Sequence, residues 1–477
     1  ATAALYGSRA GNGVVLITTK KGKAGRQTLN FKANTGWVSR GLPEYARVDA
    51  FQYYPLMWEV QRNTLAYGSA KIPLDVAGGI ASGNITTYNG SRYSGIKSLL
   101  GYNPFNVADN QIVSAEGVLN PAASLLYADD LDWADQAMQG GKKRQNYTMS
   151  YSGGSEKSDY FGSLGYTNDE GYLINSSLKR FNGRLNLNTQ PVSWFSTGLN
   201  LNGTYSKSRY DNADGGTSFI NPFYISRMIA PIYPVHLHDA NGGLVLDANG
   251  QPQYDFGDGR PFASGRHTIY ENLNDRQNQV RGAIGARTFG SVHILPGLKA
   301  TARLSFDFQD TQDRTYDNPN VGDGAPSGRA YQYLYRTTSY TFSQLAEYNK
   351  RFDKHNLQVL AGHENYGYKY NYLSGSRSGI IVDGITELVN FATVLGTTSY
   401  EDNATIESYL SRVSYDYDSK YLFSGSFRRD GNSKFSPSVR WANFWSVSGG
   451  WNINRESFFK AKWVDQLKVR ASYGVLG

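Results

Sequence analysis

Apolar and polar residues alternate with a period of two along most of this chain, and this pattern constrains the fold more than any other feature. Between residues 298 and 308, one face carries only Leu, Ala and Phe, while the other carries Lys, Thr, Arg, Ser and Asp. Segments 28–37 and 181–189 alternate in the same way. Such alternation is typical of β-strands with one apolar and one polar face.

Thirteen such strands are predicted, and the connections between them alternate between long and short. The predicted strands are 27–38, 144–153, 158–168, 179–189, 194–206, 276–289, 297–309, 337–350, 355–366, 404–417, 420–429, 441–453 and 465–474. The long connections are 39–143, 169–178, 207–275, 310–336, 367–403 and 430–440. The short connections are 154–157, 190–193, 290–296, 351–354, 418–419 and 454–464.

This sorting of connections indicates an all-β, antiparallel transmembrane β-barrel. Outer-membrane barrels have short periplasmic turns and long extracellular loops, whereas a soluble sandwich has no reason to sort its loops this way. We therefore expect the long connections to lie together on the extracellular side and the short ones on the other. The cellular location predicted is the outer membrane, with membrane lipid around the wall.

Composition supports a membrane wall with a polar interior. The chain has 36 Tyr and 52 Gly among 477 residues, and a mean hydropathy of −0.50. No stretch approaches the ~20 apolar residues of a membrane helix, whereas a barrel with an apolar outside and a polar inside looks hydrophilic on average. The net charge of +8 is interspersed, so no nucleic-acid arm is predicted, and the absence of cysteine excludes disulfides and thiolate metal sites.

An odd number of strands leaves open edges, where unpaired backbone groups in lipid would be prohibitively costly. We therefore expect the sequence to be truncated at both ends. The first residues include "YGSRAGNGVVLITTKKGK" (6–23), a glycine-rich turn that leads into a β-branched run. Gly11 and Gly13 permit a positive φ or a close backbone approach, and Arg9 calls for a carboxylate partner. No helix follows, so this is not a phosphate loop.

This string resembles the end of the plug domain in SusC/RagA-type TonB-dependent transporters of the Bacteroidetes outer membrane. Segment 221–257 resembles the long loop of that family, and segments 421–459 and 467–477 resemble its strand–loop–strand block. The resemblance implies a plugged barrel of about 22 strands, with about nine absent here. Residues 1–25 would be the end of the plug and its link, with a motif of Tyr6, Gly7, Arg9, Gly11 and Gly13. Residues 26–477 would be the N-terminal part of the barrel.

The resemblance also implies partners and a function. These are a SusD-like surface lipoprotein as a lid, energy from the TonB complex through a plug segment absent here, and a dimer of transporter–lipoprotein pairs. The implied function is active import of a nutrient oligomer, either an oligosaccharide or an oligopeptide. We expect Val14–Thr18 to be a plug strand inside the barrel and the link near Lys20–Gly25 to lead to the wall.

Aromatic residues at strand ends are predicted to form a girdle at the membrane interface, although aromatics favour strands in any case. These residues are Trp37, Trp194, Phe195, Tyr205, Phe289, Phe308, Tyr421 and Tyr473. His236, His238 and Asp239 could hold a metal, but a solvated loop is favoured, and no metal or other cofactor is predicted. The Asp-x-Asn-Gly repeats at 239–242 and 247–250 read as hairpin turns rather than calcium loops.

Aromatic residues in the predicted loops are the proposed ligand surface, because sugars and peptides both use aromatic rings. The substrate-binding candidates are Phe223, Tyr224, Arg227, Tyr233 and Tyr254, with Tyr331, Tyr333 and Tyr335 as further loop aromatics. The alternative is that these side chains only pack within the loops. No catalytic motif is recognisable, so no enzyme is predicted. A passive porin, an adhesin and a barrel-embedded enzyme remain the alternative functions.

Overall fold

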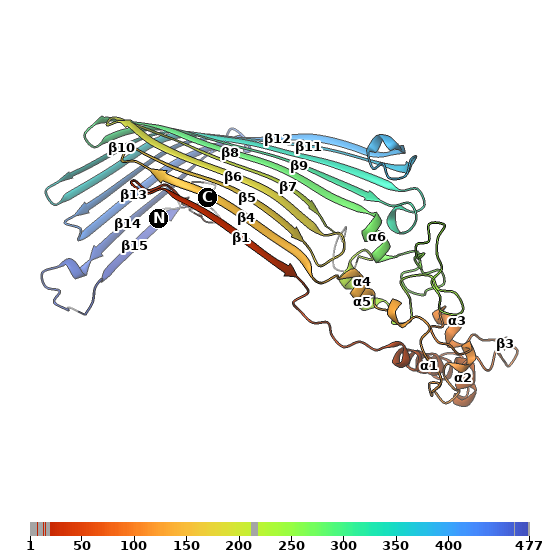
Figure 1. Cartoon of the computed structure of the whole chain (residues 1–477). Coiled ribbons are helices and arrows are strands. Elements are labelled where there is room, and N and C mark those ends of the chain that lie inside the picture. The colour runs from red at the N-terminus through yellow and green to blue at the C-terminus, as the bar shows by residue number, and fades with distance from the viewer. Residues whose placement is uncertain are drawn as a thin grey trace.

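The computed structural model is dominated by one curved antiparallel sheet with a helical lobe at one end (Figure 1). It describes residues 7, 13, 15, 20–210, 218–461 and 463–475. Thirteen strands follow one another in sequence order, with β1 and β15 at the two edges of the described sheet. These wall strands are β1 (Thr28–Val38), β4 (Lys142–Gly154), β5 (Ser158–Glu170), β6 (Ser177–Val192), β7 (Phe195–Arg209), β8 (Arg276–Leu295), β9 (Leu298–Asp317), β10 (Arg329–Phe352), β11 (His355–Ile380), β12 (Phe391–Tyr417), β13 (Tyr421–Asn432), β14 (Trp441–Asn452) and β15 (Lys468–Val475).

The lobe consists of residues 39–141 and 218–275, which carry all the α-helices of the described chain. Its elements are α1 (Ala50–Tyr67), α2 (Leu74–Ala81), β2 (Thr87–Tyr88), β3 (Ser91–Arg92), α3 (Ile96–Leu100), η2 (Asp109–Gln111), η3 (Ala128–Asp130), α4 (Trp133–Ala137), α5 (Pro222–Met228) and α6 (Thr268–Asn274). The 3-10 turns η4 (Gly322–Gly324), η5 (Leu388–Asn390) and η6 (Ile453–Arg455) lie between wall strands. None of the helices in the described ranges is long and apolar enough to span a membrane.

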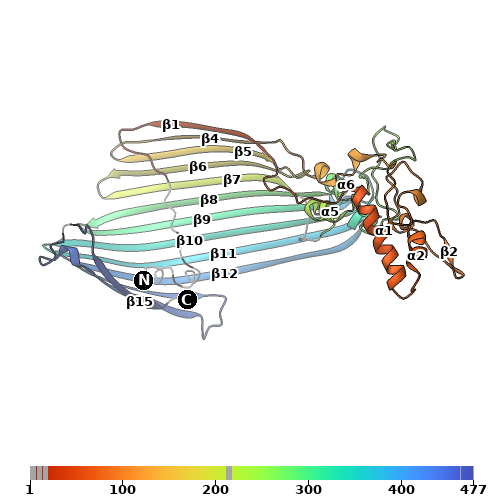
Figure 2. The same ribbon diagram turned by 90° about the horizontal axis from the view of Figure 1, so that it is seen from below.

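All thirteen predicted strands are present, and the predicted sorting of connections holds except at 453–467, which lies at the short-turn end but is longer than the connection 433–440 at the other end. Because consecutive strands pair antiparallel, the long connections emerge at one end of the sheet and the short ones at the other. The helices gather at the long-loop end (Figure 2). The larger of two buried clusters in the described lobe, which includes Trp58, Trp133 and Tyr233, joins the loop after β1 to the loop after β7.

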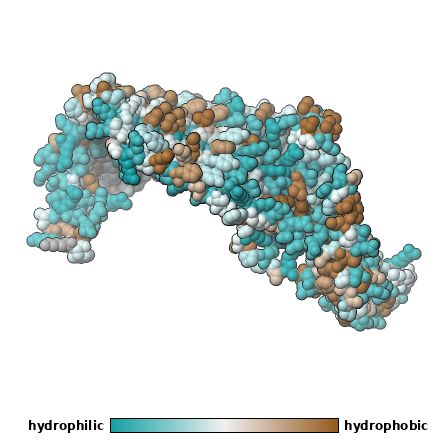
Figure 3. Space-filling model, viewed as in Figure 1, coloured by the Kyte–Doolittle hydropathy of each residue, from teal (hydrophilic) through white to brown (hydrophobic). Residues whose placement is uncertain are grey.

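The two faces of the wall differ as the alternation predicts. Apolar side chains from neighbouring strands form a continuous outer surface, and Leu164 on β5 is 70% exposed there. In Figure 3, hydrophobic residues gather along the convex side of the sheet. The opposite, inner face is polar, and on it Asn186 donates a hydrogen bond from Nδ2 to the carbonyl of Lys20 (3.0 Å).

Two predicted loops are wrong in extent, because much of 310–336 and 367–403 is strand. β10, β11 and β12 contain 24, 26 and 27 residues, whereas ~9–11 residues suffice to cross a bilayer. These strands are therefore more than twice as long as a bilayer crossing needs, and their extra residues lie toward the long-loop end. Phe289 is also wrong as a girdle residue. It pairs with Arg303, on the polar face, whereas Trp37, Tyr205 and Tyr473 are exposed on the apolar face.

Candidate functional site

The projecting strands carry a dense array of tyrosines on their inner face. Tyr331, Tyr333 and Tyr335 occupy alternate positions of β10, opposite Thr315, Asp313 and Thr311 of β9. Cross-strand partners share a face of the sheet, so these rings lie on the polar side. The same argument places tyrosines of β11 and β12 beside them. We call this array the tyrosine ladder: Tyr331, Tyr333, Tyr335, Tyr366, Tyr368, Tyr370, Tyr372 and Tyr400.

The rings of the ladder are in contact along and across the strands. Ring centroids of Tyr331 and Tyr333 lie 6.5 Å apart with planes at 1°, and those of Tyr333 and Tyr335 lie 6.3 Å apart at 15°. Across strands, Tyr335 lies 5.3 Å from Tyr372, which lies 5.1 Å from Tyr400. Each of these rings is therefore held by its neighbours, and together they present an extended aromatic surface.

A groove of about 360 Å³ runs beside the ladder at the lobe end. Its lining includes Asp313 and Asp317 of β9 and Ser218 of the lobe. Asp317 accepts a hydrogen bond from Arg329 (3.0 Å), and Asp313 accepts one from Gln279 (3.0 Å). Aromatic faces next to carboxylates suit a ligand that offers both apolar ring faces and hydrogen-bond donors.

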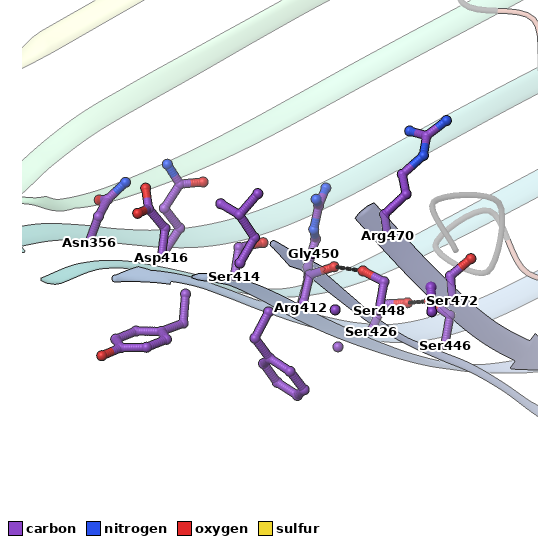
Figure 4. A pocket seen from close by; sticks show the side chains of 18 of the residues that line it. Asn356, Arg412, Ser414, Asp416, Ser426, Ser446, Ser448, Gly450, Arg470 and Ser472 are labelled. Carbon is purple, nitrogen blue, oxygen red and sulfur yellow. Dashed lines mark hydrogen bonds between the residues drawn. The ribbon is translucent and has the colours of Figure 1, made fainter. Parts of the chain in front are cut away.

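A second inner-face pocket, of about 730 Å³, lies nearer the short turns between β11 and β15 (Figure 4). Its polar lining includes Arg412, Lys468 and Arg470, with Asp416 as its one carboxylate among the described residues. The hydroxyls of Ser426 and Ser446 hydrogen-bond across β13 and β14 (2.6 Å). The pocket is polar and mainly cationic.

Between the ladder and this pocket, the inner face contacts the N-terminal segment. Arg428 of β13 is 2% exposed and donates to Asp430 (2.6 Å), Glu364 (3.1 Å) and Ser408 (2.8 Å). Gly7 packs directly on this network with φ at +58°, and a Cβ atom at this position would clash with Oδ2 of Asp430.

The rest of the predicted N-terminal motif is only partly described. Tyr6, Arg9 and Gly11 lie outside the described residues, as do all but Val15 of Val14–Thr18. Gly13 has the expected positive φ, at +95°. The link 20–26 runs along the inner face of β4–β6, where the backbone N–H of Gly25 donates to the carbonyl of Gly154 (3.3 Å). The division into plug end and barrel therefore stays a proposal.

The five predicted substrate residues all lie in the lobe but do not converge on one point. On α5, Phe223 contacts the ring of Tyr172 (6.3 Å between centroids), and Tyr224 packs against the core. Arg227 of the same helix pairs with Glu44 (2.9 Å). Tyr233 is 1% exposed and Tyr254 is half-buried against His236 and His267. The further loop aromatics Tyr331, Tyr333 and Tyr335 lie on a strand instead.

The two histidines singled out in the sequence are tied to a carboxylate that sequence reasoning missed. His236 Nδ1 and His238 Nε2 lie 2.7 and 2.9 Å from the two oxygens of Asp130. Burial raises the pKa of Asp130, but the hydrogen bonds from His236 and His238 outweigh it and lower the pKa to about 2. Both Asp-x-Asn-Gly repeats form hairpin turns as predicted. In the described ranges, no group of three histidine or acidic side chains is arranged to hold a metal.

Asp275, at the end of α6, gives the lobe a pH dependence. Burial raises its pKa to about 7, although two hydrogen bonds from Asn318 (2.7 and 2.6 Å) oppose that shift. The folded state then binds this proton more tightly than the unfolded chain does. The contribution to stability is therefore complete below about pH 4 and is lost as pH rises through 7.

Asp275→Asn is expected to stabilise the lobe by roughly 1–3 kcal/mol at pH 8, because the amide keeps the acceptor and never ionises. At pH 4 the variant and the parent should melt alike. Thermal melting followed by near-UV circular dichroism at both pH values checks this. A variant that melts lower than the parent at pH 8 would show that the ionised carboxylate is stabilising.

The comparisons agree with this geometry, although no family model matches the chain. TonB-dependent receptor P3 of Formosa agariphila is 27% identical over 486 residues, which cover 99% of this chain and 40% of that protein. TonB-dependent receptor SusC of Bacteroides thetaiotaomicron is 25% identical over 490 residues, 99% of this chain and 42% of that protein. The chain is SusC/RagA-like. A solved structure of the RagAB peptide transporter superposes with a TM-score of 0.71 at 25% identity, over 99% of this chain and 50% of that one.

These matches confirm the predicted resemblance and the fold class. The SusC/RagA-like chain spans about two fifths of the length of the curated relatives it matches. The similar proteins are receptors and a transporter rather than enzymes, which fits the absence of a recognised catalytic motif in the sequence.

Proposed function

We propose that this SusC/RagA-like chain forms part of an outer-membrane importer that takes up a nutrient oligomer by a TonB-dependent mechanism. The observation that carries this proposal is the position of the chain before the first wall strand. Gly7 packs on Arg428 and Asp430, and the link at Lys20 bonds to Asn186, both on the inner face. An inner face that carries Gly7 and Lys20 of the chain's own N-terminal part suits a plugged, energised importer better than an open porin.

The proposed partners are those that the resemblance to SusC/RagA-type transporters implies, and the position of the helical lobe at the long-loop end is compatible with a lid there. A SusD-like lipoprotein covers the long-loop end, the TonB complex supplies energy through the plug, and two transporter–lipoprotein pairs form a dimer. The solved neighbour RagAB is a peptide transporter, so an oligopeptide is a candidate substrate beside an oligosaccharide.

The geometry suggests how transport proceeds. The tyrosine ladder holds the oligomer above the N-terminal segment, because its rings are immobilised by one another. Displacement of the segment from the Arg428 network then opens the way to the polar pocket of Arg412 and Arg470 near the short turns. The part of this path near the short turns is hydrophilic, so an oligomer released from the rings meets hydrogen-bonding groups there.

Energy dependence tests the proposed function. We expect cells that carry the receptor to accumulate a labelled oligosaccharide or oligopeptide, and to stop when the proton-motive force is collapsed or TonB is deleted. Uptake that persists in de-energised cells would identify a porin instead. Neither an adhesin nor a barrel-embedded enzyme is favoured by any feature of the described residues.

The ladder is tested by Tyr333→Ala combined with Tyr335→Ala. Loss of two stacked rings should weaken ligand binding by about 1–3 kcal/mol if both are anchors, with normal amounts of receptor in the membrane. Tyr340→Ala is the matched control, because Tyr340 lies on the same strand but on the outer face. Equal affinity in the double variant and the control would remove the ladder from the binding site.

A further inference from the structure

The outer face of the wall has an apolar hollow of about 690 Å³, centred on β6 and β7. Large side chains border it, and Phe181, Tyr205 and Ile284 are each more than half exposed. The hollow is deepest in side-chain terms where Gly183 of β6 pairs with Gly203 of β7. Lipid packs on a membrane protein through close van der Waals contact, so a hollow of this polarity suits an acyl chain.

Two lysines face each other directly beyond this hollow. Lys179 of β6 and Lys207 of β7 are cross-strand partners, as are Phe181 and Tyr205 two positions away. All four side chains therefore share the outer face, and both lysines are exposed. The lysines lie on the long-loop side of the two rings. On these strands the apolar band of the wall ends at the rings, and a pair of positive charges follows.

The lysine pair has no counter-ion in the described part of the chain. The other cross-strand partners, Asn168 of β5 and Val280 of β8, are neutral. Glu170 lies on the same face of β5, opposite Ser177, but forms no ion pair with either lysine. Like charges directly opposite each other destabilise an antiparallel pair. An anion held between the two ammonium groups would relieve this repulsion.

Other cations of the outer face do have carboxylate partners. Lys369 of β11 pairs with Glu401 of β12 (2.7 Å), and Arg336 of β10 pairs with Asp310 of β9 (2.9 Å). Next to the lysine pair, Arg209 donates only to a backbone carbonyl among the described residues (3.3 Å) and adds a third positive charge. Uncompensated positive charge is therefore concentrated on β6 and β7, beside the hollow.

We propose that this surface binds one phosphate-bearing lipid of the extracellular leaflet. Its phosphate lies between Lys179 and Lys207, and one acyl chain lies in the hollow. A single lipid matches both features, because its charged group and its chains are joined at the boundary where the apolar band ends. The phosphate accepts charge-assisted hydrogen bonds from both ammonium groups. This inference goes beyond import and needs only the outer-membrane location.

The lipid site is tested on receptor purified in detergent, by native mass spectrometry, which reports bound lipid and oligomeric state together. The probe is bisphosphorylated lipid A, compared with its dephosphorylated form and with inorganic phosphate. We expect only lipid A to bind tightly, and equimolar phosphate not to displace it. Lys179→Gln combined with Lys207→Gln should weaken lipid A binding roughly thirtyfold. Lys369→Gln, which removes a lysine that already has a partner, should bind like the parent.

The hollow is tested by filling it. A Cβ at Gly203 would meet its nearest described atom, the carbonyl oxygen of Ala283, at 4.0 Å. Valine suits a strand, so Gly203→Val should fold and weaken lipid A binding severalfold by displacing the chain. Gly162→Val is the matched control, because Gly162 lies on the outer face of β5 but outside the hollow, with no described atom within 4 Å of its Cβ position.

The proposal is overturned if lipid A does not bind, if the double lysine variant binds it as the parent does, or if the dephosphorylated form binds equally well. Equal affinities for the two valine variants would remove the acyl chain from the hollow. A dimer that dissociates in the double lysine variant, with lipid A affinity unchanged, would assign this surface to a second copy. Melting temperatures show that the variants are folded. Because binding in detergent involves no uptake, this site and the proposed function fail separately.

Discussion

Gly7→Ala should release the N-terminal segment from the wall, at a cost of about 3–5 kcal/mol. The left-handed backbone of Gly7 contributes about 1 kcal/mol of this cost. The larger part comes from the new methyl group, which would clash with Oδ2 of Asp430 and lie 2.7 Å from Nε of Arg428. Because both side chains are buried in one ion-paired network, moving either one leaves a charge without its partner.

Limited proteolysis of the purified receptor measures this release, because a displaced segment is cleaved faster. Gly13→Ala is the matched control, since Gly13 also has a positive φ (+95°), but a Cβ at this position would meet no atom of the described residues within 4 Å. Its effect should stay near ~1 kcal/mol. Equal cleavage rates for the two variants would mean that only backbone strain matters and that Gly7 is not seated on Arg428.

The wall is predictable because a membrane imposes its own pattern on a strand. Lipid on one side and polar groups on the other force every second residue to be apolar, as in 298–308, where β9 runs as expected. Strand residues outside the bilayer do not face lipid, so they need not be apolar at every second position. In 391–404 of β12, polar residues occupy both faces, so the period-two signal fades, although pairing with β11 continues as far as Phe391.

The assignment of part of the tyrosine ladder to a loop has a physical reason. Tyr331, Tyr333 and Tyr335 are recognisable as neighbouring aromatics, but no apolar face accompanies them to indicate a strand. Their pairing with β9 and β11 comes from backbone hydrogen bonds, which leave little trace in the side-chain pattern. The tyrosines of β11, such as Tyr368 and Tyr370, repeat at every second position and could have been found by that spacing.

The lobe is not predictable from local sequence, because its core joins segments far apart in the chain. Trp133 donates a hydrogen bond to the carbonyl of Tyr233 (2.9 Å), and Asp130 accepts one from the backbone N–H of His236 (2.7 Å). In each case about a hundred residues separate the partners. Within each loop, these side chains look like exposed polar or aromatic residues, so the sequence alone does not distinguish ligand contact from packing.

Tyr233→Ala separates those two roles. Tyr233 is 1% exposed, its hydroxyl donates to the carbonyl of Leu100 (3.1 Å), and its ring meets that of Tyr102 edge-on at 5.0 Å. Truncation leaves a cavity and an unpaired carbonyl, so we expect the lobe to lose about 3–5 kcal/mol and to melt roughly 10 °C lower.

The matched control is Tyr67→Ala, at the end of α1, where the side chain is 65% exposed. Its cost should stay within about 0.5 kcal/mol. Receptor that remains folded with Ala at position 233 should bind ligand as the parent does, because a buried ring can hold the lobe together without touching a ligand. An unchanged melting temperature with weakened ligand binding would instead return Tyr233 to the ligand-contact role that the sequence suggested.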